Sequence, residues 1–133
     1  MIRSEIPSTL FAAPRPGYDY GRNAPVGEDI VLEWIAQVKA VGVKSITCLL
    51  NNEHLKLYGS IAGGLIQSYR NAGFVVAHIP VADHQSPPLS SNDLMTLERC
   101  FYELPKPVLV HCSAGVDRSG AAVMHLKQVW KHI

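Results

Sequence analysis

Cysteine is scarce in this sequence, which holds only Cys48, Cys100 and Cys112. An odd number of cysteines in no metal-binding spacing excludes a disulfide framework and a structural zinc site, and nothing else in the sequence predicts a metal or a cofactor. The first residues lack the apolar core of a signal peptide, and no apolar run approaches the roughly 20 residues of a membrane-spanning helix. We therefore expect a cytoplasmic protein without a membrane span, in a reducing compartment where a free thiolate persists.

An excess of charge of one sign is also missing. Twelve Lys and Arg stand against eleven Asp and Glu, for a formal net charge of +1. This balance predicts neither a nucleic-acid partner nor an anionic membrane surface. The 133 residues are 47% hydrophobic, which excludes a disordered or collagen-like chain and predicts a single domain, 1–133, that buries its own core.

Apolar periodicity predicts an α/β fold. Helical spacing covers residues 28–41, 60–71, 90–104 and 119–133, and Ser90 with Asp93 resembles a capping box at the start of the third helix. Short apolar runs at 43–50, 74–79 and 107–111 predict buried strands, a run at 9–13 predicts an edge strand, and the rest of 1–26 is expected to be loop. Helices that alternate with such strands predict a central, mostly parallel sheet flanked by helices on both faces. Its reacting groups should lie on loops at the carboxyl ends of the strands.

The segment from His111 to Gly120 joins a predicted strand to a predicted helix. A tight turn into a helix directs successive backbone N–H groups at one point, which makes an anion-binding cradle. Small residues let the backbone approach a ligand closely, and the planar guanidinium of Arg118 can hold two phosphate oxygens at once. The predicted phosphate-binding residues are Ser113, Ala114, Gly115, Val116, Asp117 and Arg118.

Cys112 stands at the bottom of this cradle. The converging amide dipoles, the helix N-terminus and Arg118 all stabilise negative charge, which favours a thiolate placed for in-line attack on phosphorus. Ser119 is in a position to donate a hydrogen bond to the sulfur when the sulfur leaves. His111 is expected to be an orienting residue behind the loop.

These residues, HCSAGVDRS, resemble the signature of the cysteine-dependent protein tyrosine and dual-specificity phosphatases: His-Cys, five residues, Arg, and Ser or Thr. The resemblance implies the fold of that family and an enzyme, a phosphoric monoester hydrolase. It implies a phosphorylated protein or another phosphomonoester as substrate and no cofactor. Some relatives also form a protective disulfide with the catalytic cysteine, so Cys48 is either a core residue or such a partner for Cys112.

The family uses an aspartic acid on a separate loop as general acid, and Asp83 resembles it. Asp83 is the only carboxylate between Glu53 and Asp93, and it follows the strand predicted at 74–79. The resemblance implies that Cys112 attacks phosphorus while Asp83 protonates the leaving oxygen, and that water then hydrolyses the phosphocysteine with Asp83 as base.

Two features leave alternatives open. Asp117 stands where tyrosine phosphatases usually carry Gly, as in some lipid-active phosphatases, so a phosphoinositide or small phosphoester is the alternative to phosphotyrosine. Only fifteen residues follow Arg118, so the chain is either a minimal member or truncated, and no residue is assigned to position the hydrolytic water. A non-catalytic phosphoresidue-binding module is the third alternative. The sequence leaves the oligomeric state open.

Overall fold

A single sheet organises the computed structural model, which describes residues 2–19, 23–82 and 84–130. The strands of this described part are β1 (Arg3–Ile6), β2 (Leu10–Ala13), β3 (Ser45–Cys48), β4 (Val75–His78) and β5 (Val108–His111). Their order is β1-β2-β5-β3-β4, with parallel pairs throughout except for the antiparallel pair of β1 with β2. The predicted mostly parallel sheet is confirmed.

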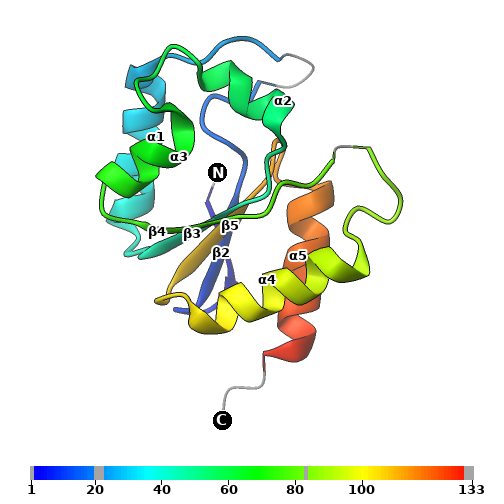
Figure 1. Ribbon diagram of the computed structural model, residues 1–133. Coiled ribbons are helices and arrows are strands. Elements are labelled where there is room, and N and C mark those ends of the chain that lie inside the picture. The colour runs from blue at the N-terminus through cyan, green and yellow to red at the C-terminus, as the bar shows by residue number, and fades with distance from the viewer. Residues whose placement is uncertain (1, 20–22, 83, 131–133) are drawn as a thin grey trace.

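Helices cover both faces of the sheet (Figure 1). On one side lie α1 (Glu28–Ala40), the short α2 (Asn52–Leu55) with a 3₁₀ turn η1 (Lys56–Tyr58), and α3 (Gly64–Asn71). On the other side lie α4 (Ser91–Glu103) and α5 (Asp117–Val129). Among the described helices, none is long and apolar enough to cross a bilayer.

The central strand β5 is buried on both faces, as a parallel strand between two helical layers must be. Leu109 belongs to the hydrophobic cluster under α1 and α3, whereas Val108 and Val110 belong to the cluster under α4 and α5. Side chains alternate between the faces of a strand, so one four-residue strand contributes to both cores. This arrangement carries the chain from the middle of the sheet directly into the loop that follows His111.

The predicted capping box of α4 is present. The Ser90 hydroxyl accepts a hydrogen bond from the Asp93 backbone N–H at 3.1 Å, and the Asp93 carboxylate accepts one from the Ser90 backbone N–H at 3.0 Å. Two otherwise unpaired N–H groups are satisfied reciprocally, which fixes where the helix begins.

The N-terminal prediction needs two corrections. The strand at Leu10–Ala13 is internal rather than an edge strand, because β1 pairs with it on its outer side. β1 itself lies in the stretch expected to be loop. Its sequence RSEI buries only Ile6, so it carries no apolar periodicity, and it forms because β2 offers an open row of backbone partners.

Helix boundaries also differ from the prediction. The helix expected from residue 60 begins at Gly64, because Gly63 and Gly64 adopt φ of +79° and +80°, which interrupts a right-handed helix before that point. The last helix, expected over 119–133, begins at Asp117 rather than Ser119 and ends at Val129, because Trp130 is extended. The short turns α2 and η1 were not predicted, because such short pieces leave no periodic pattern.

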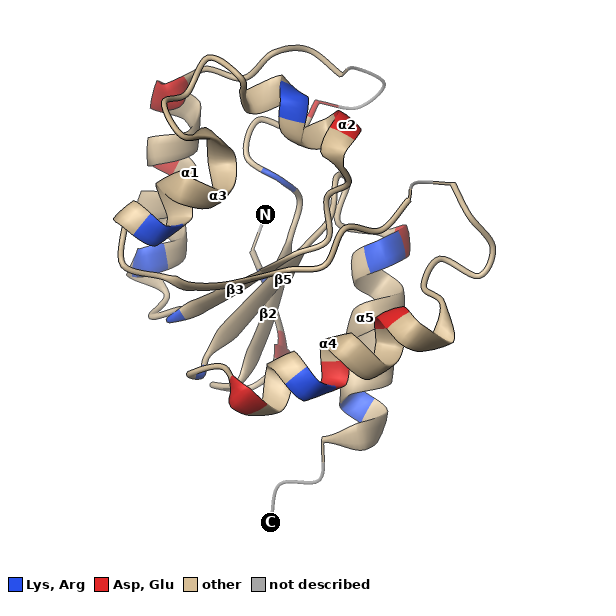
Figure 2. Ribbon diagram, viewed as in Figure 1, with Lys and Arg blue, Asp and Glu red and all other residues tan. Residues whose placement is uncertain are grey.

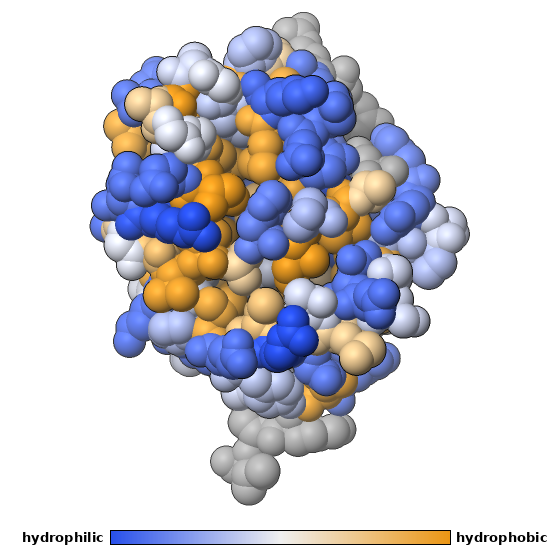
Figure 3. Space-filling model, in the orientation of Figure 1, coloured by the Kyte–Doolittle hydropathy of each residue, from blue (hydrophilic) through white to orange (hydrophobic). Residues whose placement is uncertain are grey.

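Charged residues of both signs are interspersed over the helices in the view of Figure 2. On the face drawn in Figure 3, apolar side chains form separate patches between polar ones. The mixture of charges in Figure 2 agrees with the formal net charge of +1.

Candidate active site

The segment singled out in the sequence leaves β5 at the carboxyl edge of the sheet. Residues 112–116, called here the cysteine loop, connect His111 to the first turn of α5. The Cys112 side chain is buried, with only 2% of the residue exposed, and Ser113 and Gly115 are buried beside it. Val116 and Asp117 face outward, and Val116 is 64% exposed. Four of the predicted phosphate-binding residues, 113–116, therefore lie in the cysteine loop, and the other two, Asp117 and Arg118, begin α5.

Carbonyl groups of the cysteine loop are held from outside by other residues. The Ser113 carbonyl accepts a hydrogen bond from the Arg15 backbone N–H at 2.9 Å, and the Gly115 carbonyl accepts one from Arg3 Nη2 at 2.9 Å. The Cys112 carbonyl accepts one from the His111 ring at 3.0 Å. In a trans peptide the next N–H points the opposite way from the carbonyl, so these bonds turn the following amides to the inner side of the loop.

Gly115 is required by the shape of the loop. Its φ is +77°, and a Cβ built there would lie 2.9 Å from Pro14 N and 3.0 Å from Ala13 C. Both obstacles are backbone atoms, which have no freedom to move aside. The loop therefore packs directly on the chain that leaves β2.

His111 lies behind the loop in a buried aromatic cluster. Its Nδ1 donates to the Cys112 carbonyl, so its Nε2 accepts from the Tyr69 hydroxyl at 2.9 Å. Trp34 packs edge-on against the same ring. Burial and the positive charges of Arg118 and Arg15 lower the pKa of His111 to about 4. The imidazole is therefore neutral near pH 7, which suits an orienting residue and not a proton donor.

Arg118 and Ser119 occupy the first turn of α5. Arg118 is 2% exposed; its Nη1 donates to the carbonyls of Val81 at 3.0 Å and Leu49 at 3.5 Å, and its Nη2 lies 3.5 Å from His54 Nδ1. The Ser119 hydroxyl is buried and has no hydrogen-bond partner among the described residues. A buried hydroxyl without a partner is costly, so this position is poised to bond a group that the protein alone does not supply.

Asp83 lies outside the described residues. The chain leading to it leaves β4 and is anchored beside the site: Val81 N–H donates to the Leu49 carbonyl at 3.3 Å, and Val81 O accepts from Arg118. Asp117 is exposed in the first turn of α5, where a negative charge is stabilised by the helix dipole.

Cys48 lies at the carboxyl end of β3, in register with His111 of β5. It is fully buried, and burial raises the pKa of its thiol to about 12, so it stays a neutral thiol. Cys48, Cys100 and Cys112 are all free. The core interpretation of Cys48 agrees with its burial, and its redox role stays a prediction.

Three residues beside the site were not singled out as site residues in the sequence. Arg15 is buried and reaches the Ser113 hydroxyl, while Tyr58 on η1 holds the other end of its guanidinium. His54 on α2 faces Arg118. Arg15 lies in the N-terminal stretch expected to be loop, and only the packing of distant segments shows that its side chain is buried.

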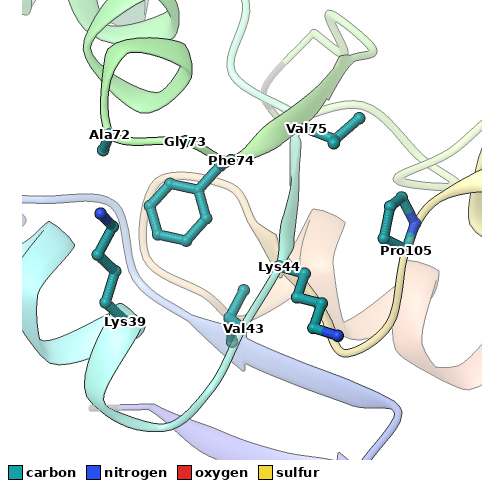
Figure 4. Close-up of a pocket in the computed structure, with 8 residues that line it drawn as sticks. All are labelled: Lys39, Val43, Lys44, Ala72, Gly73, Phe74, Val75 and Pro105. Atoms are coloured by element: carbon teal, nitrogen blue, oxygen red, sulfur yellow. The ribbon is translucent and has the colours of Figure 1, made fainter.

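A hollow of about 410 Å³ lies at the amino ends of the parallel strands, at the opposite edge of the sheet (Figure 4). It is formed where α1 ends, β3 and β4 begin, and the chain approaches β5, far along the strands from Cys112. Its described lining is apolar apart from two lysines, with no cysteine, hydroxyl or carboxylate side chain: Lys39, Val43, Lys44, Ala72, Gly73, Phe74, Val75 and Pro105. The chemistry is therefore concentrated at the cysteine loop and not in this hollow.

Comparison with known proteins yields a family match over most of the chain. A family model described as a polymorphic toxin system DSP-PTPase phosphatase matches residues 21–130. The dual specificity protein phosphatase OPG106 of Vaccinia virus, in the Western Reserve and Copenhagen strains, is 39% identical over 57 residues. That match covers 41% of this chain and 33% of the viral protein, so the chain spans about a third of the length of these curated relatives.

Solved structures share the fold at low identity. The kinase associated phosphatase KAP has a TM-score of 0.64 at 19% identity, over 92% of this chain and 68% of that one. A DUF442 protein of Shewanella putrefaciens, named as a phosphatase, has a TM-score of 0.60 at 18% identity, over 98% and 74%. The core domain of the PP-IP phosphatase SIW14 of S. cerevisiae has a TM-score of 0.51 at 15% identity, over 98% and 66%. These similarities confirm the fold class.

Proposed function

The chain belongs to the DSP-PTPase phosphatase family, and from this premise we propose that it hydrolyses phosphotyrosine monoesters, with phosphoserine and phosphothreonine as further substrates. The proposed reaction passes through a phosphocysteine intermediate on Cys112. It needs no metal, because the loop amides and Arg118 supply the positive potential around the phosphate.

One observation carries the proposal. The buried Cys112 begins a loop whose carbonyls are bonded on the outside, next to a buried Arg118 and a Ser119 hydroxyl that has no partner in the described chain. Such an arrangement suits a tetrahedral dianion, since amides and a guanidinium match its oxygens while the sulfur lies behind the phosphorus. A catalytically inert binding module has no need of a nucleophile at that point.

In the first step, Cys112 Sγ forms a bond to phosphorus as the ester P–O bond breaks. The leaving oxygen takes the proton of the Asp83 carboxyl group. In the second step, water attacks the phosphocysteine and gives a proton to the Asp83 carboxylate, while the S–P bond breaks to give thiolate and inorganic phosphate. Ser119 would stabilise the departing sulfur by donating the hydrogen bond that its hydroxyl lacks among the described residues.

The rim of the loop supports phosphotyrosine over a polyanionic head group. Val116 is exposed and apolar, and Ala114 in the same loop adds no charge. A head group with several phosphates would favour additional cations at these positions. A neutral aromatic ring does not need them.

The test is hydrolysis of p-nitrophenyl phosphate and of a tyrosine-phosphorylated peptide across pH. Cys112→Ser should abolish turnover of both, because the nucleophile is lost. Asp83→Asn should lower peptide turnover by about a hundredfold or more, and affect p-nitrophenyl phosphate less, because that leaving group needs little protonation. Asp29→Asn, an exposed change on α1, is the matched control and should leave turnover unchanged.

Other outcomes separate the alternatives. If Asp117→Asn is the damaging change and Asp83→Asn is not, the acid lies at the cysteine loop, and phosphoinositide substrates become the better hypothesis. If the reduced wild-type protein binds the phosphopeptide without turnover, the chain is a binding module and the proposed reaction is wrong.

A further inference from the structure

Arg15 and Arg118 are the most deeply buried arginines of the described chain, each with 2% of the residue exposed. Arg15 follows β2, far in sequence from the cysteine loop, yet its backbone and side chain both bond that loop. Its N–H donates to the Ser113 carbonyl at 2.9 Å, and its Nε donates to the Ser113 hydroxyl at 3.0 Å. The proposed mechanism does not use this residue.

The other end of the guanidinium is also held. Arg15 Nη1 donates to the Tyr58 hydroxyl at 3.2 Å, and that hydroxyl donates in turn to the Pro16 carbonyl at 2.6 Å. The Tyr18 ring lies 5.7 Å from the guanidinium carbon. Burial of a guanidinium is expensive unless it is compensated, so a purely structural link between β2 and η1 would be served as well by apolar side chains.

The hydrogen bond from Arg15 Nε to the Ser113 hydroxyl restricts where that hydroxyl can donate its own proton. A serine hydroxyl has one proton, and a guanidinium can only donate. Because Arg15 Nε occupies an acceptor position of the Ser113 oxygen, the serine proton must be donated elsewhere. Ser113 is buried in the cysteine loop directly after Cys112, so its hydroxyl is available to a phosphate oxygen held by that loop.

We propose that Arg15 is a positioning residue of the cysteine loop, which fixes Ser113 as a hydrogen-bond donor toward bound phosphate and places a second permanent positive charge behind the cradle. This inference rests on the proposed phosphatase function. Arg15 does not touch the reacting atoms; it acts through Ser113 and through its charge.

The test measures binding of tungstate, a tetrahedral dianion that resembles phosphate and is not turned over, by titration calorimetry on the full chain. Arg15→Met should raise the tungstate Kd about tenfold or more, since a charge-assisted hydrogen bond and a buried cation are lost. Arg15→Lys should raise it less, because lysine restores the charge without the planar fork. Arg70→Met, an exposed arginine on α3, is the matched control.

A double-mutant cycle separates positioning from general packing. In a Ser113→Ala background, Arg15→Met should raise the Kd by a clearly smaller factor, because the partner through which Arg15 acts is already gone. Tyr58→Phe removes the contact on the far side of Arg15 but keeps the Arg15 charge and the bond to Ser113, so it should change the Kd by less than about threefold. If circular dichroism shows that Arg15→Met does not fold, the same double-mutant cycle is measured with Arg15→Lys in its place.

Three results would overturn the inference: an unchanged Kd in Arg15→Met, an equal Arg15 effect with and without Ser113, or a Tyr58→Phe variant as damaged as Arg15→Met. Failure of the proposed function gives a different pattern. A wild-type protein that binds tungstate but hydrolyses no phosphoester refutes the enzyme, while the Arg15 cycle still decides the positioning role. A wild-type protein that does not bind tungstate refutes both.

Discussion

At the scale of single residues, Gly115 occupies a position that has no space for a side chain. Its backbone is left-handed, and a Cβ added to it would lie only 2.9 Å from Pro14 N, which leaves no room for another side chain. The cysteine loop and the chain leaving β2 therefore pack at backbone distance. The site thus depends on the absence of a side chain at this position.

Gly115→Ala should destabilise the protein by about 1–3 kcal/mol, because alanine is strained at this φ and meets backbone. Turnover should fall by at least about tenfold, since a displaced loop loses its aligned amides. Urea unfolding and phosphopeptide kinetics measure both effects. The control is Gly120→Ala in α5, where an added Cβ meets nothing within 4 Å and helix propensity predicts a gain of about 0.5–1 kcal/mol. Equal behaviour of the two variants would contradict the prediction.

His111 links burial to pH dependence. Its pKa in the folded protein is about 4 against an ordinary 6.5, so folding favours the neutral ring. The stabilisation is therefore fully present above pH 6.5 and is lost as the pH falls through 4. The difference between these two pKa values corresponds to a loss of about 3 kcal/mol at most in the free energy of unfolding.

Between about pH 7 and pH 4.5, wild type should therefore lose about 2–3 kcal/mol more of its free energy of unfolding than His111→Asn, which has no titrating ring. Urea unfolding of both proteins at the two pH values gives this difference. Leu109→Ala, a buried change on the same strand that removes no titrating group, is the control and should keep the wild-type acid sensitivity. Identical pH dependence of wild type and His111→Asn would show that His111 is not held neutral by the fold.

At the scale of elements, some helices and strands have a signal in their own sequence, and others form only through contacts with distant parts of the chain. α4 has its own start signal, and its predicted start at Ser90 is confirmed as the N-cap. β1 has no such signal and exists through its pairing with β2. α2 has a local cap at Asn51, whose side chain accepts from the His54 N–H at 2.9 Å, but one turn is too short to be stable alone. In the folded protein α2 also has a tertiary contact, because His54 Nδ1 lies 3.5 Å from Arg118 Nη2.

The capping box of α4 predicts a local and measurable cost. Ser90→Ala should lower the free energy of unfolding by about 1 kcal/mol, because the Asp93 N–H loses its partner at the helix end. Ser90→Asp should restore most of that loss, since aspartate also caps well. Ser91→Ala, one residue into the helix and exposed, is the control. A Ser90→Ala protein as stable as the control would show that the cap is not used in solution.

At the scale of the whole molecule, the two helical layers share the central strands. Leu109 and Val110 are neighbours on β5 and fully buried, yet they face different clusters. Trp34 packs against the cluster of Leu109, and Trp130 packs against the cluster of Val110. Two intrinsic fluorophores therefore report on the two sides of one sheet.

Leu109→Ala should lower stability by about 2–5 kcal/mol, and Val110→Ala by less, because each opens a cavity in one layer. Both layers should nevertheless unfold together, since β5 belongs to each. Fluorescence unfolding of Trp34→Phe and Trp130→Phe versions of each variant measures the sides separately. Coincident midpoints are expected; a Leu109→Ala transition seen by Trp34 before Trp130 would mean that the layers unfold independently.

Much of this protein was determined by local sequence. The alternation of helical and strand patterns predicted the α/β sheet, because apolar periodicity reflects which face of each element is buried. The cysteine loop was predictable as a unit, because Cys112, Gly115 and Arg118 act within one strand–loop–helix segment, and adjacent residues in such a segment stay adjacent in space. The same locality explains why the cap of α4 was found.

Only the tertiary structure decided what holds that loop in shape. Arg3 and Arg15 bond the cysteine loop itself, from segments that are distant in the chain. Tyr69 and His54, equally distant, contact the residues on either side of it, His111 and Arg118. An isolated arginine or tyrosine has no pattern that tells a solvated side chain from a buried one. Burial of Arg15 and the antiparallel position of β1 follow from which backbone and side-chain groups the fold leaves in need of partners, and that need arises only once the sheet has assembled.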